Sequence, residues 1–348
     1  MRKSAIFKDA IFLEHNPGAY HVELPERLAV IYNALDRSEM KEKFLYPFFR
    51  PASKEIIGLN HSIAHIARVE ATAGRPFGSL DPDTKTSARS YEAALMAAGA
   101  VVQAASSLWA GEIENAFTLV RPPGHHAEHQ HAMGFCLFNN IAVGAHYALK
   151  ELGVQRILIV DWDLHHGNGT QNSFYDTDQV LFFSTHQYPF YPGTGSIQEV
   201  GIGKGEGYTV NVPLPGGQDD RAYITIFHEL LVPIARQYKP ELIMVSAGFD
   251  IAKGDPLGTM RVTAQGFATL TRILLGLADE LCGGRLLLTL EGGYNLDMLK
   301  EGVLAVLAEM AGLSEANEIQ AALSGNSGQL PLVLEQIKAR QSAYWSLQ

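Results

Sequence analysis

Short apolar segments alternate along this chain with longer segments of helical period, and this alternation limits the folds that are open to it. The short segments are rich in β-branched or aromatic residues, as strands are: AIFKDAIF, AFTLV, RILIVD, VLFFST, YTVNV, LIMVSAG and RLLLTL. The helical segments between most of them include SYEAALMAAGAVVQAASSLWAG, NNIAVGAHYALKELG, DRAYITIFHELLVPIARQY and TAQGFATLTRILLGLADELCG. The pattern predicts an α/β fold with a central, mostly parallel sheet flanked by helices on both faces.

The chain shows no low-complexity segment, no clear internal repeat and no linker rich in proline and serine. Its length of 348 residues is within the range that α/β folds use for one unit, and its hydrophobic content of 47% is enough for a large core. We therefore predict a single domain over residues 1–348.

Charge and cysteine content restrict the class of function. The net charge of −10 argues against broad binding to nucleic acid or to an anionic membrane, and favours a basic peptide or a polyamine as substrate. Two cysteines make no disulfide framework, the start MRKSAIFKDAIFLEH has no apolar signal core, and no apolar run approaches the ~20 residues of a membrane span. We expect a cytoplasmic protein with no nucleic-acid or membrane partner.

Titratable residues follow five of the predicted strands. AFTLV leads into RPPGHH, RILIV into DWDLHH, VLFFS into TH, LIMVSAG into FD, and RLLLTL into EGGY. The carboxyl ends of parallel strands meet at one edge of a sheet, where ligands bind in open α/β folds. The sequence therefore predicts one site at that edge, built from all five segments.

The segment DWDLHH has the residue types of a metal site. Asp163 and His165 share one face if the chain is extended there, since residues i and i+2 point the same way. Asp161 shares that face and is expected to support a neighbour. Asp250, at the end of SAGFD, is the candidate for the third of the three protein ligands of a catalytic zinc. The alternative interpretation of DWDLHH is a polar strand end that caps the next helix.

Two other segments offer groups for acid–base and oxyanion chemistry. In RPPGHH, His125 and His126 follow a stiff Pro-Pro-Gly turn, and a histidine held near a metal-bound water is the expected general base. His129 and His131 just beyond are assigned to a solvated loop. In EGGY, Tyr294 is either a tyrosine on a surface turn or a hydroxyl donor to an oxyanion opposite the metal.

Together these segments resemble the zinc-dependent histone deacetylase family, which also includes bacterial acetylpolyamine amidohydrolases. The motifs are RPPGHHAEHQHAMGFCLFNNIAVGA, VDWDLHHGNGTQ, YPGTGSIQEVG, SAGFDIAKGDPLG and LEGGYN, and the resemblance runs from residue 15 to about residue 310. Class I members carry aspartate at the position of Asn168, so in this respect the sequence is more similar to the class II branch. The resemblance implies the arginase–deacetylase fold, one deacetylase domain over residues 1–348, and removal of acetyl or other acyl groups from lysine side chains.

The resemblance also implies a role for each matched residue. One catalytic Zn²⁺ would be bound by Asp163, His165 and Asp250. His126 would act as general base and then acid, and His125 would be an electrostatic partner of the bound water. Three further residues would orient the histidines or polarise the scissile carbonyl: Asp161, Asn168 and Tyr294.

Substrate walls and structural ions are implied in the same way. Gly134 and Phe135 would line one side of an acyl-lysine tunnel, Tyr191 the other, and Leu257 would face its mouth. Arg27 would lie beside a cavity through which acetate leaves. A structural K⁺ is expected near Asp161, Asp163, His165, Ser184 and Thr185, and a second near Phe174, Thr177, Val180 and Tyr208.

Several alternatives remain open on the sequence alone. The enzyme could be an acetylpolyamine amidohydrolase, in which Asp81 or Asp83 would meet the substrate's cations. An arginase-like ureohydrolase is disfavoured, because GHH and the terminal GGY do not fit that enzyme class. A binding protein without catalysis is also disfavoured, because all the expected metal ligands and the tyrosine are present. Cys136 is expected to be a packed thiol. The short segment ATAGRPFGSLDPDTKTSARS favours an open tunnel mouth, and the oligomeric state is left open.

Overall fold

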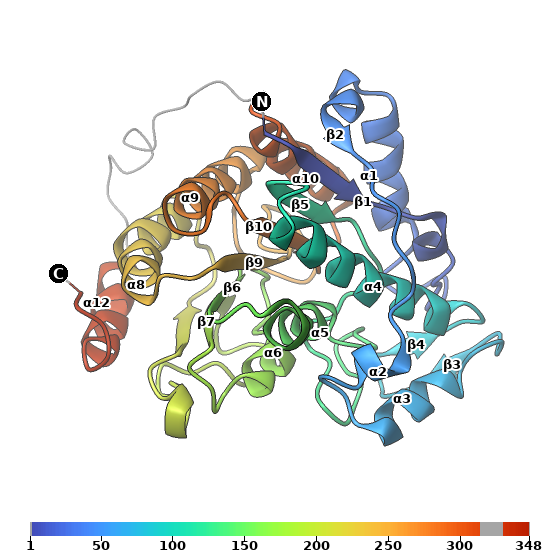
Figure 1. Ribbon diagram of the computed structural model, residues 1–348, viewed down its shortest axis with the longest axis horizontal. Helices are drawn as coiled ribbons and strands as arrows, with labels where there is room; N and C mark the ends of the chain where they lie inside the picture. The colour runs from blue at the N-terminus through green and yellow to red at the C-terminus, as the bar shows by residue number, and fades with distance from the viewer. Residues whose placement is uncertain (1, 314–329, 348) are drawn as a thin grey trace.

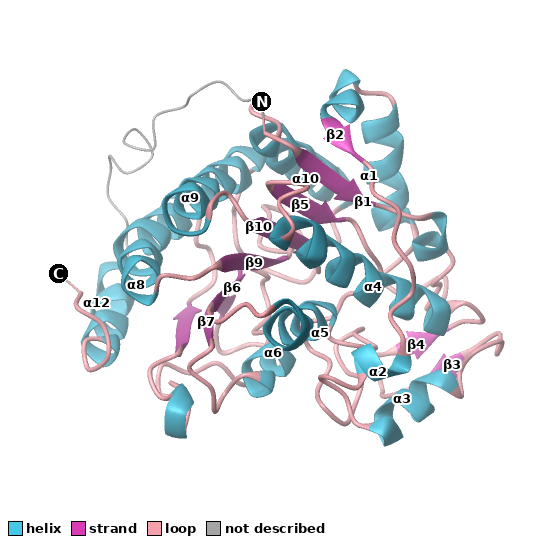
Figure 2. Cartoon of the chain, viewed as in Figure 1, coloured by secondary structure: helices cyan, strands magenta, loops and turns pink. Residues whose placement is uncertain are grey.

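The fold is a single twisted sheet with helices on both faces, as the alternation predicted (Figures 1 and 2). The computed structural model describes residues 2–313 and 330–347. Eight strands lie in the order β2-β1-β5-β10-β9-β6-β7-β8, and every neighbouring pair is parallel. They are β1 (Ser4–Phe7), β2 (Phe44–Leu45), β5 (Asn115–Thr118), β6 (Ile157–Asp161), β7 (Val180–Gln187), β8 (Thr209–Leu214), β9 (Leu242–Ala247) and β10 (Leu286–Leu290).

One layer of helices covers each face of the sheet. The first contains α4 (Ser90–Trp109) and α5 (Asn140–Tyr147), and the second contains α1 (Glu26–Asp36), α8 (Val232–Tyr238), α9 (Ala264–Cys282) and α10 (Leu296–Met310) (Figure 1). The remaining helices are α2 (Lys54–Ile57), α3 (Ile63–Glu70), α6 (Asn168–Ser173), α7 (Asp220–Ile226) and α12 (Leu330–Gln341). None of the helices in the described part of the chain is both long and apolar enough to cross a bilayer.

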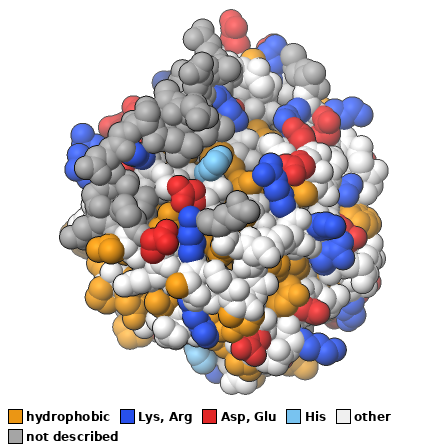
Figure 3. All heavy atoms as spheres, turned by 90° about the vertical axis from the view of Figure 1, so that its left-hand side faces the viewer, with side chains coloured by type: hydrophobic (Ala, Val, Ile, Leu, Met, Phe, Trp, Pro, Cys, Tyr) orange, Lys and Arg blue, Asp and Glu red, His pale blue; other side chains and the backbone are white. Residues whose placement is uncertain are grey.

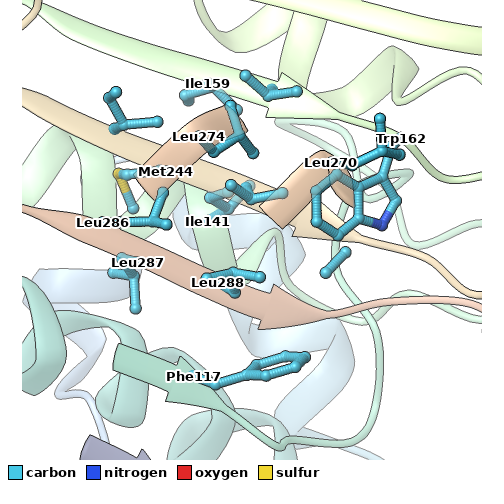
Figure 4. Packing of buried hydrophobic residues seen from close by; sticks show 14 of the residues in the cluster. Phe117, Ile141, Ile159, Trp162, Met244, Leu270, Leu274, Leu286, Leu287 and Leu288 are labelled. Atoms are coloured by element: carbon cyan, nitrogen blue, oxygen red, sulfur yellow. The ribbon is translucent and has the colours of Figure 1, made fainter. Parts of the chain in front are cut away.

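The central strands are buried on both faces, which explains their continuous apolar runs. Every residue of β6, β9 and β10 is buried. Leu270 and Leu274 of α9 pack on one face of these strands and Ile141 of α5 belongs to the same cluster (Figure 4). Each fully buried side chain of this size contributes about 1.5–3 kcal/mol to folding, so the strands are held rigidly from both sides.

Three elements differ from the sequence prediction. The run AIFKDAIF is not one strand, because Asp9 caps a 3₁₀ turn at Ala10–Leu13 by accepting a hydrogen bond from the backbone of Ile11. The helix expected over residues 220–238 is divided by a π-helical turn at Phe227–Leu231. A hairpin of β3 (Gly78–Ser79) and β4 (Lys85–Thr86) lies in the segment ATAGRPFGSLDPDTKTSARS, where no strand was predicted.

The surface carries no strong charge asymmetry on the face that Figure 3 shows. In the described part of that face, basic and acidic side chains are interspersed with hydrophobic and uncharged ones. Oppositely charged neighbours pair on the surface, for example Arg236 with Glu280 at 2.9 Å.

Candidate active site

The register of the sheet brings four of the five predicted strand ends together. Asp161 at the end of β6 pairs with Ser246 of β9, and Ala247 of β9 pairs with Leu290 of β10. The segments DWDLHH, FD and EGGY therefore leave the sheet side by side, and RPPGHH joins them from β5. The fifth prediction is wrong, because β7 continues through Thr185 and His186. His186 is buried and contacts Ser184 and the carbonyl of Gly195.

Asp163, His165 and Asp250 form one buried group whose possible ligand atoms all lie within 4.8 Å of one another. Nδ1 of His165 lies 3.1 Å from Oδ1 of Asp163 and 3.2 Å from Oδ2 of Asp250. The extended geometry assumed from the sequence does not cause this approach, since residues 163–165 form a bend after β6. Instead, the carboxylates of Asp161 and Asp163 each accept the backbone N–H two residues later, which turns the chain.

This group fits a divalent cation. Oδ2 of Asp250 is buried without a hydrogen-bond partner, so a ligand atom is left over in the protein. Burial, together with the neighbouring Asp163 carboxylate, raises the pKa of Asp250 to about 7. The backbone of Gly292 lies close to both carboxylates, since a Cβ at this position would be 2.3 Å from Oδ2 of Asp250 and 2.6 Å from Oδ2 of Asp163. An Asp-His-Asp set is a donor set that zinc accepts.

The tandem histidines lie beside this group, each held by a separate partner. Nδ1 of His125 is 3.0 Å from Oδ2 of Asp161, and Nδ1 of His126 is 2.7 Å from Oδ1 of Asn168. The environments of the two rings differ. Burial would lower the pKa of His125, but Asp163 and Asp161 outweigh it and raise the pKa to about 10. For His126, burial together with His125 lowers the pKa well below its ordinary value, so this imidazole is neutral.

A cavity of about 230 Å³ opens over these groups. Its lining includes the proposed catalytic histidines and tyrosine, one proposed metal ligand and the wall residues expected from the sequence. The lining residues are Asp83, Pro123, His125, His126, Gly134, Phe135, His165, Phe190, Tyr191, Leu257, Gly292 and Tyr294. Burial raises the pKa of the Tyr294 hydroxyl well above its ordinary value, so the phenol keeps its proton and is a donor. Its backbone N–H donates to Asp255, whose other oxygen accepts from Leu257.

The wall at Gly134 and Phe135 has an unusual backbone. Both residues have positive φ, 55° and 69°, and a Cβ at Gly134 would lie 2.3 Å from the ring of His126. The wall is held by the hairpin, since Asp83 accepts from the N–H of Gly134 and Thr84 from that of Phe135. Asp83 also lines the cavity, so the loop of this hairpin is part of the cavity wall.

The other predicted residues fall into two sets. Asp81 does not line the cavity and builds the hairpin turn by accepting the N–H groups of Asp83 and Thr84. Arg27 lies behind the lining, with its guanidinium 4.8 Å from the ring centroid of Tyr294. His129 and His131 are exposed, as expected, and Cys136 is a buried thiol whose pKa is raised well above its ordinary value by burial.

The residues expected around potassium ions are partly brought together. Ser184 pairs with Asp161 across β6 and β7, and the hydroxyl of Thr185 is 3.5 Å from the carbonyl oxygen of Asp161. In the second set, the N–H of Thr177 donates to the carbonyl of Phe174 at 3.4 Å. Val180 begins β7, and Tyr208 comes directly before β8.

Three buried or half-buried glutamates near the site were missed by the sequence interpretation. Glu291 accepts the N–H groups of Gly124 and His125, and burial raises its pKa to about 7. Glu23 binds both Arg27 and Arg121 in a fully buried network. Glu128 contacts Asn168 at 2.5 Å. Glu128 and Glu291 lie within the quoted motifs RPPGHHAEHQHAMGFCLFNNIAVGA and LEGGYN, which were the available signal, whereas Glu23 lies in none of them.

Comparison with known proteins gives consistent matches. Residues 21–310 match the histone deacetylase domain family. Histone deacetylase 15 of Arabidopsis thaliana is 40% identical over 330 residues, which is 93% of this chain and 59% of that protein. A probable deacetylase of Archaeoglobus fulgidus is 41% identical over 304 residues, covering 86% of this chain and 84% of the relative.

The fold agrees with a solved member of the family. The crystal structure of the HDA15 HD domain superposes with a TM-score of 0.92 at 38% identity, covering 99% of this chain and 95% of that one. The sheet and its helices are thus the arginase–deacetylase α/β fold. The chain spans little more than half of Arabidopsis thaliana histone deacetylases 15 and 18, 59% and 52%. On the family match and these identities, the chain belongs to the histone deacetylase family, a family of zinc-dependent deacetylase enzymes.

Proposed function

We propose that this chain hydrolyses acyl-lysine side chains with one zinc ion held by Asp163, His165 and Asp250. The observation that carries the proposal is the convergence of these three buried side chains with a neutral histidine and a protonated tyrosine around one cavity. When bound, zinc supplies Lewis-acid chemistry, since it lowers the pKa of a water to about 7 and polarises a carbonyl oxygen.

The protein's own groups complete the amide hydrolysis. His126 accepts the proton of the attacking water at Nε2 and later gives it to the leaving amine, because its neutral ring faces the cavity. Tyr294 donates its hydroxyl to the oxyanion that forms from the acyl carbonyl. Asp161 keeps His125 oriented and favours its charged form, which places positive charge near the reacting oxygen.

The substrate is proposed to be a lysine side chain in a peptide or protein. Phe135 and Tyr191 supply aromatic walls to the cavity, and Leu257 adds an apolar side chain to its lining. The residue that favours the alternative, an acetylpolyamine, is Asp83, which lines the same cavity. Its Oδ1 already accepts hydrogen bonds from the Gly134 N–H and the Thr84 hydroxyl, so this oxygen is engaged in holding the cavity wall.

Other features remain predictions. One K⁺ is proposed near Asp161, Ser184 and Thr185, where the strand pairing gathers a buried carboxylate and a hydroxyl; the second, near Phe174, Thr177, Val180 and Tyr208, rests on the family resemblance. Arg27 beside an acetate exit, a single domain over 1–348 and a cytoplasmic location are also predictions. The two described cysteines are free and buried, in keeping with a reducing compartment.

Kinetics on a substrate panel test the proposal. The zinc-loaded protein is assayed on acetyl- and longer acyl-lysine peptides, acetylputrescine and acetylspermidine. We expect the highest kcat/KM on an acyl-lysine peptide and loss of activity with a chelator. A preference for acetylpolyamines over every peptide would replace the substrate class, and no hydrolysis of any amide in the panel would refute the function.

A further inference from the structure

Glu128 lies on the far side of Asn168 from the proposed base. Its Oε1 lies 2.5 Å from Nδ2 of Asn168 and 2.9 Å from Nδ2 of Asn172, and its Oε2 lies 3.1 Å from the same Asn172 nitrogen. The other end of the Asn168 amide, Oδ1, lies 2.7 Å from Nδ1 of His126. The three side chains thus form a relay of Glu128, Asn168 and His126 that begins outside the cavity and ends in it.

The relay determines which nitrogen of His126 carries the proton. An amide side chain has one accepting end and one donating end, and its orientation follows from its hydrogen-bond partners. A carboxylate only accepts, so the NH₂ end of Asn168 must face Glu128 and the carbonyl end must face His126. Nδ1 of His126 then has to be the donor. Since a neutral imidazole carries one N–H, Nε2 is left with its lone pair free.

We propose that Glu128 is a positioning residue that fixes the productive tautomer of His126 through the Asn168 amide. The inference rests on the proposed function, in which Nε2 of His126 is the proton acceptor. The opposite amide orientation would place its carbonyl oxygen 2.5 Å from the Glu128 carboxylate and its NH₂ against Nδ1 of His126, leaving the proton on Nε2. That tautomer has no lone pair for the water proton.

The surroundings of Glu128 allow a decisive substitution. Glu128 is half-buried and borders a second cavity, of about 260 Å³, that it shares with Asn60, His129, His146 and Asn172. A longer or differently charged side chain has space there without entering the catalytic cavity. Glu128→Lys replaces an acceptor by a group that only donates, whereas Glu128→Gln still offers a carbonyl oxygen to Asn168.

The first test is a double-mutant cycle. In Glu128→Lys the Asn168 amide turns its oxygen to the ammonium, so we expect kcat to fall about 10–100-fold with little change in KM, the range typical of changes to outer partners of a metal site. Glu128→Gln should retain more activity than Glu128→Lys. Asn168→Asp should lower kcat in the wild type, where it puts two carboxylates in contact, but raise it in the Glu128→Lys background. Glu301→Lys, the same charge change at an exposed position of α10, is the matched control.

The decisive result of the cycle is that Asn168→Asp changes kcat in opposite directions in the two backgrounds. If Glu128 had only a structural role, the double variant would be less active than either single variant. Equal activity of Glu128→Lys and the wild type, or failure of Asn168→Asp to raise kcat in Glu128→Lys, would overturn the proposal. Matching thermal unfolding midpoints confirm that the compared variants are folded.

The second test reads the tautomer directly and needs no catalysis. Nitrogen NMR of protein labelled at histidine, with and without a chelator, reports which ring nitrogen of His126 is protonated; the resonance is identified by its loss in His126→Gln. We expect Nδ1–H in the wild type and Nε2–H in Glu128→Lys. Nε2–H in the wild type refutes the relay even if the enzyme is active. An inactive wild type with Nδ1–H refutes the proposed function and leaves the relay standing.

Discussion

The floor and the rim of the cavity are built differently. The floor consists of buried polar side chains that follow the ends of β5, β6 and β9 and have partners on neighbouring segments: His125, His126, Asp161, Asp163, His165 and Asp250. The rim consists of side chains on loops outside the sheet, Asp83, Phe190, Tyr191 and Leu257. Phe190 and Tyr191 are 36% and 38% exposed, whereas Asp161, Asp163 and Asp250 are fully buried.

This contrast indicates which properties each region controls. The sheet register and several hydrogen bonds fix the position of each floor side chain. A substituted floor residue therefore has no alternative arrangement in which the site would still work. Apart from Asp83, which holds the wall at Gly134, the rim side chains have fewer partners and more solvent, so a change there alters an interaction without dismantling the site. Floor substitutions should therefore abolish catalysis, and rim substitutions should alter substrate choice.

The largest expected effect is the loss of metal in Asp250→Ala. This substitution removes a proposed ligand whose Oδ2 has no hydrogen-bond partner, and it also removes the acceptor of the Leu164 N–H. We expect little bound zinc and activity reduced by more than the ~10–100-fold of a change to an outer partner. Asp161→Asn is the comparison, since it should keep most of its zinc and fall within that range. Metal analysis of the purified variants that finds full zinc in Asp250→Ala would remove Asp250 from the ligands.

Tyr294→Phe should have the next largest effect, because Tyr294 belongs to both regions. Its backbone is tied by Asp255 to the rim residue Leu257, but its hydroxyl serves the floor chemistry. Loss of one oxyanion donor typically costs about 10²–10³ in kcat. We expect that loss with unchanged zinc content and folding. A Phe variant with a near wild-type kcat on an acetyl-lysine peptide would show that another group stabilises the oxyanion.

A pH measurement tests whether burial holds His65 in its neutral form. The Nε2–H of His65, on α3, donates to the carbonyl of Leu137, and burial lowers the pKa of this imidazole to about 4. Its neutral form is favoured in the folded protein, so its contribution to stability is complete above the unfolded pKa of about 6.5 and is lost as pH falls towards 4.

We therefore expect His65→Gln to gain stability relative to the wild type by about 2 kcal/mol between pH 7.5 and pH 5. Urea unfolding at both pH values measures this difference. Ile66→Val on the same helix removes no titrating group and should show a difference that does not depend on pH. A pH-independent difference for His65→Gln would mean that His65 is not held neutral.

The smallest expected effect is at the rim. Leu257→Glu places a carboxylate among the lining residues without touching the floor. One partly exposed ion pair is worth about 0.2–1 kcal/mol, so kcat/KM for acetylspermidine relative to an acetyl-lysine peptide should rise several-fold at most. Leu257→Gln, of the same size without charge, is the control. An equal shift in both variants would mean that polarity or shape, and not charge, sets the preference.

The floor could be predicted from the sequence because its residues directly follow strands. Asp163, His165 and Asp250 were found through their place after buried apolar runs, and the sheet register brings them together. The reason given for the Asp163–His165 pair was wrong in detail, since side chains accept backbone N–H groups and bend the chain there. The motif was informative although the local conformation was not the one assumed.

The rim and the supporting carboxylates could not be predicted in the same way. The hairpin around Asp83 becomes part of the wall by contacting Gly134, 51 residues further along the chain. Glu23 and Arg121 are separated by 98 residues, and Glu291 and Gly124 by 167. Such partners follow from how loops fold back over the sheet, which strand and helix patterns do not specify.

The most direct test of the central claim, one zinc site that serves amide hydrolysis, is a metal titration of the chelator-treated protein assayed on an acetyl-lysine peptide. We predict that activity rises in proportion to added zinc, reaches its maximum at one ion per chain, and that Asp250→Ala shows no such rise. Activity that requires two ions per chain, or that is unaffected by removing metal, would contradict the account.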